Sequence, residues 1–460
     1  MDKKMLATTD KTSHRSIYDS LAKEESTMAQ PWLEELRHGA MAHFDLVGFP
    51  NSRREEAWRF TNIDPIIRTT FKLGDLEGPD SGAMSAEKYS FGTEAVVELV
   101  FVNGQYVSRL SKHGKLPRGA KVTNLAQAFD SESDLLERHL GKYAAIEKSP
   151  FVALNTGFVR DGALIHLQRG TTVEQAIHLI FISTGGHEPT VSHPRVLVIA
   201  EDNVEATVVE SYVGSGSGVY FTNAVTEFIT GADCRIDHCK LHQENLSAYH
   251  IATMQVSLGR SSRFISHAAT LGGRITRNDL NVKMNGEFAD ATLNGLVIIN
   301  GEQHVDNHTL LQHEKANCPS HELYKHVLDG KSTAVFKGQI FVQKDAQKTD
   351  SKQSSKSLLL SDDAYMNSQP ALEIYADDVK CTHGSTTGPV DEDMVFYLRS
   401  RGVGMEAARH LLTYAFAADI TRRIRVAPVR RRLEEFMAAQ HGLPQDLAIT
   451  DLGMHDEKAR

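Results

Sequence analysis

The sequence has few cysteines, no long apolar run and no excess of basic charge. Its 460 residues include only four cysteines, and none of them forms a CxxC pair. This spacing excludes a disulfide framework and argues against a zinc or iron–sulfur cluster held by this chain's own cysteines alone. A formal net charge of −9 gives no basic footprint for nucleic acid. No apolar run approaches the roughly 18 residues that a membrane-spanning helix needs.

The first residues also lack the marks of a targeting segment. The stretch MDKKMLATTDKTSHRSIYDSLAKEE has no apolar core of the kind a secretory signal carries. Its five acidic residues argue against an organellar transit peptide. We therefore predict a reduced, cytoplasmic protein in which the cysteines stay free.

Five regions of different composition follow one another along the chain. Residues 1–30 are a polar extension, and 31–92 are predicted to be helical because PWLEELRHGAMAHFDLVGF has apolar residues at helical spacing. Residues 93–389 contain short runs rich in Val, Ile, Thr and Phe, separated by Gly, Asp and Asn. Residues 390–442 return to a helical pattern, and 443–460 are a polar tail.

The central region predicts a mainly β structure. VVELVFVNGQYVS contains Asn103-Gly104, a hairpin signal, and GALIHL, AIHLIFIS, RVLVIA and EATVVESYV follow as strands. No long helical pattern separates these runs, so a βαβ fold is not expected. Segments starting at 203, 231, 259 and 286 align with one another, at steps of 28, 28 and 27 residues. Such a period suits the coils of a β-solenoid, although the alignment alone does not separate it from a β-sandwich.

The helical region near the C-terminus contains three segments. DEDMVFYLRSRG ends at Gly402, and GMEAARHLLTYAFAADITRRI places Ala408, Leu411, Leu412, Ala415, Phe416 and Ile420 on one face. APVRRRLEEFMAAQHG then has Pro428 in its first turn. The basic cluster in these segments predicts a docking face for an acidic protein partner rather than for nucleic acid, because the whole chain is acidic. This cluster comprises Arg422, Arg423, Arg425, Arg430, Arg431 and Arg432.

Two other candidate sites are weak. DGKST at 329–333 resembles the end of a phosphate-binding loop, but Lys325 occupies the position of its first glycine. Five histidines crowd the segment from 304 to 326, where His304 and His308 share a strand face and Cys318 lies nearby. A transient metal or proton site is one interpretation, and solvated histidines along a sheet are the favoured one. The five are His304, His308, His313, His321 and His326.

The most suggestive pair is Cys381 and His383, within DDVKCTHGSTTG. The run ALEIYADDVKCTHG alternates like a strand, so both side chains should point to one side, roughly 6–7 Å apart. One thiolate and one imidazole provide two ligands, whereas a tetrahedral site needs four. A shared metal site, a thiol nucleophile with its base and a structural pair all remain open, and spacing alone favours the last. Cys234 and Cys239 are predicted to be core residues on opposite faces of a strand.

Several long blocks resemble one known family. LEIYADDVKCTHGSTTG with DEDMVFYLRSRGV, preceded by HVDNHTLLQH, NCPSHELYKHVLDGKSTAVFKGQIFV and AQKTDSKQSSKSLLLSDDAYMNSQP, resembles the SufB/SufD family of iron–sulfur cluster assembly scaffolds, in its SufD branch. Near the N-terminus, RREEAWRFTNI is similar to an element of the same branch. The resemblance covers about 50–440. The block CTHGSTTG departs from the common CSHGATVG by carrying more hydroxyl groups.

The resemblance implies a right-handed parallel β-helix core flanked by N-terminal and C-terminal α-helical regions. It implies a non-enzymatic scaffold that pairs with a SufB-like paralogue and a SufC-like ATPase, with ATP bound by that partner only, and that could form a homodimer when alone. Cys381 and His383 would hold a transient iron–sulfur cluster shared with the paralogue. Use of a flavin stays open, and a stand-alone sulfurtransferase or a purely structural regulator of the ATPase are the alternatives. Residues expected to dock the ATPase are Phe396, Tyr397, Arg399, Arg401, Arg430, Arg431 and Arg432.

Overall fold

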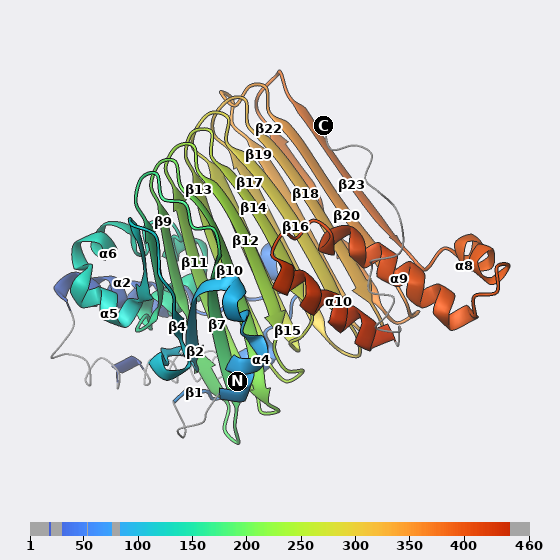
Figure 1. The fold of residues 1–460 in the computed structure, drawn as a ribbon, viewed down its shortest axis with the longest axis horizontal. Coiled ribbons are helices and arrows are strands. Elements are labelled where there is room, and N and C mark those ends of the chain that lie inside the picture. The colour runs from blue at the N-terminus through green and yellow to red at the C-terminus, as the bar shows by residue number, and fades with distance from the viewer. Residues whose placement is uncertain (1–17, 20–29, 53, 76–82, 442–460) are drawn as a thin grey trace.

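Two parallel β-sheets form the middle of the molecule, and helices lie toward both ends of the chain (Figure 1). The computed structural model describes residues 18–19, 30–52, 54–75 and 83–441. Most of the predicted extension 1–30 and all of the predicted tail 443–460 therefore lie outside the described residues. Within those ranges, no helix combines the length and the apolar character needed to cross a membrane.

Strands alternate between the two sheets from β9 to β20, so each coil of the chain adds one strand to each sheet. The pairing between coils is parallel and in register, which identifies a parallel β-solenoid and excludes the β-sandwich. The first sheet contains β6 (Gly162–Leu167), β9 (Arg195–Ala200), β11 (Tyr220–Thr230), β13 (Tyr249–Leu258), β15 (Ile275–Met284), β17 (His304–His313), β19 (Thr333–Val342), β21 (Tyr365–Ser368) and β22 (Ala371–Ile374). The second contains β2 (Ala95–Val102), β7 (Ala176–Gly185), β10 (Glu205–Gly216), β12 (Arg235–Gln243), β14 (Arg263–Thr270), β16 (Asp290–Ile299), β18 (Pro319–Leu328), β20 (Asp350–Leu359) and β23 (Lys380–Gly388).

The repeat seen in the sequence corresponds to one corner of each coil. At this corner a non-glycine residue adopts a left-handed φ between 55° and 63°, just before a strand of the second sheet. The backbone N–H of each corner residue donates to a carbonyl of the next coil, as Asn203 does to Ala232 at 2.8 Å. Asn and Asp tolerate this conformation better than most residues, so their recurrence marks the turn. The corner residues are Asn203, Asp233, Ser261, Phe288, Asn317 and Lys348.

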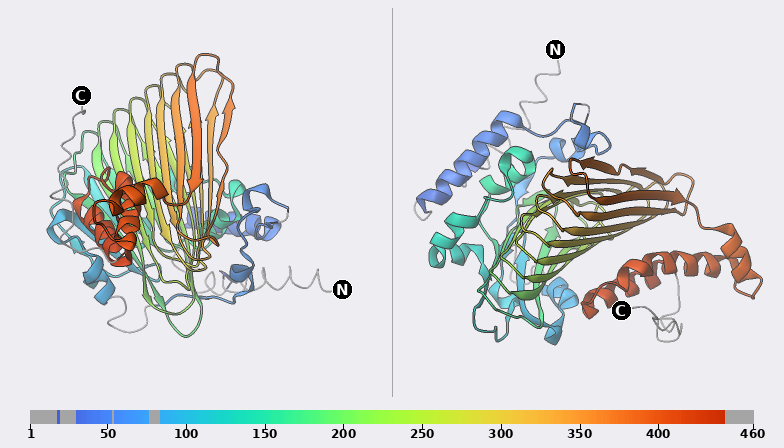
Figure 2. Two further views of the ribbon diagram at one scale, coloured as in Figure 1. Left: turned by 90° about the vertical axis from the view of Figure 1, so that its right-hand side faces the viewer. Right: turned by 90° about the horizontal axis from the view of Figure 1, so that it is seen from above.

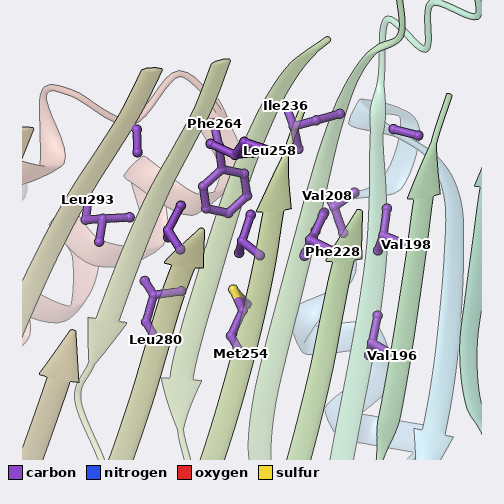
Figure 3. Packing of buried hydrophobic residues seen from close by; sticks show 14 of the residues in the cluster. Val196, Val198, Val208, Phe228, Ile236, Met254, Leu258, Phe264, Leu280 and Leu293 are labelled. Carbon is purple, nitrogen blue, oxygen red and sulfur yellow. The ribbon is translucent and has the colours of Figure 1, made fainter. Parts of the chain in front are cut away.

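The hydrophobic core runs along the inside of the solenoid, between the two sheets (Figure 3). Ile236 and Phe264 are register partners in the second sheet, and they face Met254 and Leu280 from the first. Because like side chains stack from coil to coil, each coil is buried by its neighbours. Burial of one such side chain contributes about 1.5–3 kcal/mol.

Short elements connect the N-terminal residues to the solenoid. Asn103 and Gly104 both have positive φ, and they join β2 to an antiparallel β3, which confirms the predicted hairpin. The elements before this hairpin are α2 (Pro31–Val47), η1 (Glu56–Trp58), α3 (Asp64–Arg68), β1 (Lys72–Leu73), α4 (Ala83–Tyr89) and η2 (Gly92–Glu94). The remaining short elements are β3 (Gln105–Tyr106), η3 (Ser108–Leu110), β4 (Lys112–His113), β5 (Ala120–Asn124) and β8 (Thr190–Ser192).

Helices within the range 93–389 are a departure from the sequence prediction, which expected only β structure there. α5 (Leu125–Ser131), α6 (Ser133–His139), η4 (Ile146–Lys148) and α7 (Pro150–Gly157) come between β5 and β6. Leu125 and Leu136 pack on Leu164 and Leu197, on the outer face of β6 and β9. Helices this short carry only two turns of periodic pattern, too little to be recognised from sequence.

Three helices follow β23, and the last two of them cover part of the outer face of the second sheet, as the right panel of Figure 2 shows. They are α8 (Glu392–Arg399), α9 (Met405–Thr421) and α10 (Ala427–His441), and they confirm the predicted helical region. Ile420 and Leu433 pack on Val209 and Leu241 of the sheet. Ala415 of the predicted apolar face is exposed instead.

Candidate functional site

The last strand of the solenoid, β23, carries Cys381 and His383. It pairs with β20 in parallel register, Cys381 opposite Ser351 and His383 opposite Gln353. It is the outermost strand of the second sheet, and no other described strand pairs with its free edge. The sequence run thought to lead into it as one strand is in fact two, because β22 belongs to the first sheet and residues 375–379 turn the corner. We call β21, β22 and β23 the terminal coil.

Cys381 and His383 both face the interior of the solenoid end. Their register partners Ser351 and Gln353 are buried, at 0% and 3% exposure. Side chains at paired positions of parallel, in-register strands point to the same face of the sheet. Cys381 is half-buried and packs against the interior core, whereas His383 is exposed. The prediction that the two side chains share one side is therefore confirmed. They differ from inner residues of earlier coils only because no described coil stacks on top of them.

The local chemistry does not favour a cysteine nucleophile acting alone. Burial, with a smaller contribution from the Asp350 carboxylate, raises the pKa of the Cys381 thiol above its ordinary value, although the backbone N–H of Ser351 opposes this. The thiol is thus protonated at neutral pH, and the thiolate is the reactive form. Within the described ranges no side-chain hydrogen bond joins Cys381 to His383. A soft metal ion bound there would displace the proton and favour thiolate.

The other cysteines cannot complete a cluster within this chain. Cys234, Cys239 and Cys318 are all buried, and Cys234 packs in the solenoid interior while Cys239 lies under the C-terminal helices. This confirms the prediction that Cys234 and Cys239 fill the core on opposite faces. Cys381 is therefore the one partly exposed cysteine.

The terminal coil also exposes apolar side chains. Tyr365 of β21, Ile374 of β22 and Tyr375 after it are exposed at 58%, 38% and 60%. An unpaired sheet edge next to exposed aromatic residues is a typical surface for association with another chain.

Helix α8 extends beyond the solenoid, away from the second sheet (Figures 1 and 2). Asp391 caps it, accepting from the backbone N–H groups of Asp393 and Met394. Phe396 and Tyr397, both among the predicted docking residues, are exposed at 72% and 48%. The Arg401 guanidinium lies 4.0 Å from the centre of the Tyr397 ring. Arg399 is exposed in the last turn of the helix.

Arg430, Arg431 and Arg432 all contact this chain itself. Arg431 pairs with Glu94 at 2.7 Å. Arg432 donates to the carbonyls of Lys88 and Tyr89, and its guanidinium stacks on the Tyr89 ring at 4.6 Å. Arg430 donates to the carbonyl of Ile424. The contacts of Arg431 and Arg432 hold α10 against α4 and η2, a structural role that the sequence prediction of a docking face did not include.

The crowded histidines do not come together as one site. His304 hydrogen-bonds Thr61 and Thr333, whereas Nε2 of His308 lies 2.9 Å from Oδ1 of Asp306, so the two rings contact different side chains. His313 and His326 are buried, and His321 is exposed.

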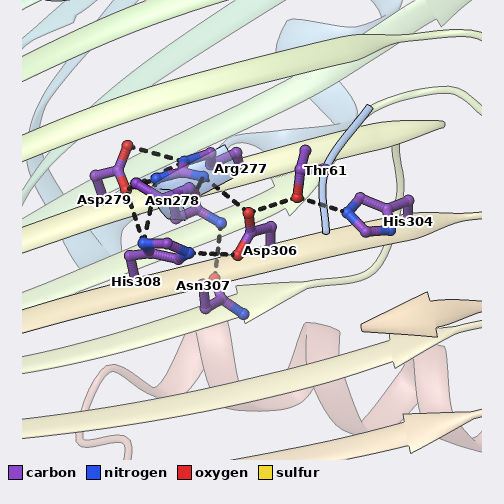
Figure 4. Close-up of polar contacts among 9 residues, drawn as sticks. Thr61, Arg277, Asn278, Asp279, His304, Asp306, Asn307 and His308 are labelled. Carbon is purple, nitrogen blue, oxygen red and sulfur yellow. Dashed lines mark hydrogen bonds and ion pairs between the residues drawn. The ribbon is translucent and has the colours of Figure 1, made fainter. Parts of the chain in front are cut away.

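A polar cluster that the sequence did not reveal joins the N-terminal region to the solenoid (Figure 4). Arg277 pairs with Asp306 at 3.0 Å and with Asp279 at 2.9 Å. Its guanidinium stacks on Trp58 at 3.8 Å and donates to the Ala57 carbonyl. Thr61 donates to Asp306 at 2.5 Å. Trp58 and Thr61 belong to EAWRFTN, so this motif serves to fasten the chain's N-terminal part onto β15 and β17; we call the cluster the Arg277 clamp.

Glu322 lies in the interior beneath His383. It is the register partner of Gln353, which in turn is the register partner of His383. Gln353 Nε2 donates to Glu322 Oε2 at 2.6 Å. Burial raises the pKa of Glu322 to about 7, although hydrogen bonds from its neighbours oppose the shift. A single acidic residue in a β-type run has no sequence signal that marks it as buried.

Comparisons with known proteins agree with this arrangement. Residues 181–416 match the SufBD core domain of the SUF system for FeS cluster assembly, and residues 9–179 match the SufBD N-terminal region. An iron–sulfur cluster assembly SufBD family protein of Synechocystis sp. is 30% identical over 412 residues, 88% of this chain and 90% of the relative. The iron–sulfur cluster assembly protein SufD of Escherichia coli is 30% identical over 413 residues, 89% of this chain and 91% of the relative. The chloroplastic protein ABCI7 of Arabidopsis thaliana is 28% identical, over 88% of this chain and 85% of the relative. The chain therefore belongs to the SufBD family of iron–sulfur cluster assembly proteins.

Proposed function

We propose that this protein is a scaffold subunit whose terminal coil supplies half of a cluster-assembly site, completed by a SufB-like paralogue. The observation that carries the proposal is the position of Cys381 and His383, side by side on one face of β23, whose outer edge pairs with no other described strand. A thiolate and a neutral imidazole are suitable ligands for iron, and two more ligands must come from elsewhere. A second solenoid docked on the terminal coil would bring them. The iron–sulfur cluster is then cargo that is built and passed on.

Helix α8 is the proposed contact for a SufC-like ATPase. Its exposed Phe396 and Tyr397, with Arg399 and Arg401 beside them, combine aromatic anchors with positive charge. Aromatic and arginine side chains are the residues that dominate binding energy at interfaces. ATP would be bound by that partner. Because α8 follows β23 after only a short connection, a movement of this helix could alter how exposed Cys381 is.

The test is coexpression of the chain with the paralogue and the ATPase, followed by anaerobic visible absorption of the purified complex. Cys381→Ser and His383→Ala should each reduce the cluster absorption without dissociating the complex. Ser385→Ala, on the same strand and face, is the matched control and should leave the absorption unchanged. If both variants keep the wild-type cluster yield, the ligand role is refuted, and a purely structural role in the complex remains.

The alternative of a stand-alone sulfurtransferase makes a different prediction. It requires persulfide formation on Cys381 in the isolated chain, for which trapping with an alkylating reagent is the assay. The raised pKa of the Cys381 thiol favours little persulfide in the absence of partners. Rapid persulfide formation on the isolated chain would instead favour the enzyme.

A further inference from the structure

Two imidazoles and one carboxylate meet inside the solenoid, away from the terminal coil. His242 is the second-last residue of β12, Glu244 lies in the turn that follows, and His250 is the second residue of β13. Nε2 of His242 is 2.7 Å from Oε2 of Glu244, and Nδ1 of His250 is 2.8 Å from the same oxygen. The three ligand atoms lie within 4.8 Å of one another, and no other group of metal-ligand side chains in the described ranges meets that criterion.

We propose that His242, Glu244 and His250 form a buried binding site for a divalent first-row transition metal ion, Fe²⁺ or Zn²⁺. Two imidazoles with one carboxylate are the ligand set of several zinc enzymes and of non-haem iron sites. Here the ligands converge on one point from two consecutive strands of the two sheets and the turn between them, and each side chain is at most 1% exposed.

Neighbouring side chains hold the three proposed ligands in place, as the side chains around a metal site do. The second oxygen of Glu244 accepts a hydrogen bond from Thr222 Oγ1 at 2.7 Å, which fixes the carboxylate. The edge of the His250 ring packs against Tyr212, with ring centres 4.9 Å apart. Such outer contacts orient ligands and are part of a working metal site.

The buried charges around the triad favour the binding of a cation. Glu210 and Glu244 are both buried, and Lys240 is the lysine that faces them, 3.1 Å from Nε2 of His250. His238 hydrogen-bonds Glu210 at 3.2 Å. Two carboxylates therefore face one ammonium. An unbalanced buried charge is costly, so a metal ion bound there would stabilise the cluster. A metal ion would replace the hydrogen bonds to Glu244 by coordinate bonds.

The triad lies beside a turn at the surface. Glu244 lies in the turn between β12 and β13, and Leu246, two residues further on, is 64% exposed. This turn is hydrogen-bonded to the neighbouring coils, because Asn245 Nδ2 donates to the carbonyls of Gly216 and Gly218 and the backbone N–H of Gly273 donates to the Glu244 carbonyl. The site is distinct from Cys381 and His383, which lie on the terminal coil.

The experiment uses the full chain with Cys381→Ser and His383→Ala, so that the exposed ligands are absent. One equivalent of Co²⁺ is added anaerobically, weakly held metal is removed by gel filtration, and the retained cobalt is measured together with its visible spectrum. We expect about one bound ion per chain with nitrogen and oxygen ligands only. His242→Gln and His250→Asn, which keep an amide near each ligand nitrogen, should abolish retention. His187→Gln, at an exposed histidine, is the control and should change nothing.

Retention of cobalt that is unaffected by the triad variants would overturn the proposal, as would no retention at all. Displacement of Co²⁺ by Fe²⁺ or by Zn²⁺ identifies the preferred ion, and displacement by neither also overturns it. X-ray absorption of the zinc-loaded protein with the triad intact covers the case in which the variants do not fold. Nitrogen and oxygen neighbours at about 2.0–2.1 Å are expected, and a sulfur neighbour at about 2.3 Å would refute the assignment.

Discussion

Replacing Glu322 by Gln should stabilise the protein at high pH and not at low pH. Glu322 is 3% exposed, and burial raises its pKa from an ordinary 4.5 to about 7. The folded state therefore holds this proton more tightly than the unfolded state does. Between pH 4.5 and pH 7 the unfolded chain binds fewer protons at this position, so the free energy of unfolding falls as pH rises through that interval.

The magnitude follows from the shift. A change from 4.5 to about 7 is roughly 2.5 pKa units, and each unit corresponds to about 1.4 kcal/mol. The ionised carboxylate therefore lowers the stability by about 3 kcal/mol above pH 7, compared with pH 4. Glutamine has the same shape and never ionises. It can still accept from Gln353 through its amide oxygen, so the hydrogen bond seen at 2.6 Å is retained.

The assay is urea denaturation of the wild-type and Glu322→Gln proteins at several pH values between 4 and 8. The difference in stability should be near zero at pH 4 and should grow to about 3 kcal/mol by pH 8, with an unchanged dependence on urea. Glu302→Gln, at an exposed position, is the control and should show no such growth. A constant difference across the range would mean that the pKa of Glu322 is the same in the folded and unfolded states, and the reasoning would fail.

Three further predictions concern the Arg277 clamp, the cysteines and α10. Arg277→Met removes the guanidinium that pairs with the buried Asp306, so we expect the free energy of unfolding to fall by about 3–5 kcal/mol and hydrogen exchange in η1 to become faster. The exposed Arg274→Met is the control, and unchanged exchange would refute the clamp. Maleimide should modify Cys381 alone in the native protein, and the rate should still rise above pH 8 because the pKa of this thiol is raised. Labelling of several cysteines, or a labelling rate that is already constant at pH 7, would contradict this prediction. Arg432→Glu should loosen α10 from Tyr89 and lower thermal stability even without any partner, whereas an unchanged melting temperature would return this arginine to the docking face.

Much of the fold could be predicted from the sequence because a solenoid is built from local repeats. The period of the aligned segments, the hairpin at Asn103-Gly104 and the C-terminal helices were all correct. The helices between β5 and β6 were missed, since each has two turns and its apolar face packs on a strand distant in sequence.

The candidate site was only half predictable. The alternation of side chains along a strand was enough to place Cys381 and His383 on one side of β23. Only the structure shows that Cys234, Cys239 and Cys318 are buried and cannot join Cys381 in holding a cluster. The sequence predicted that Arg431 and Arg432 belong to a docking face for a partner. In the structure they bind Glu94 and the carbonyls of Lys88 and Tyr89, more than 300 residues earlier in the chain.

The repeat, the strands, the terminal helices and the pair Cys381 and His383 can all be identified from the sequence, because each depends on residues within a few positions of one another. Tertiary structure alone decided which side chains stack from coil to coil. Coiling brings residues about 30 positions apart into register, so Glu322 comes to lie under Gln353 and His383, and Arg277 beside Asp306. The two histidines and the glutamate of the buried triad are close in sequence, but only the closing of the turn between β12 and β13 makes their ligand atoms converge. The burial and the charged partners of these residues depend on how the coils stack, so no local sequence pattern can predict them.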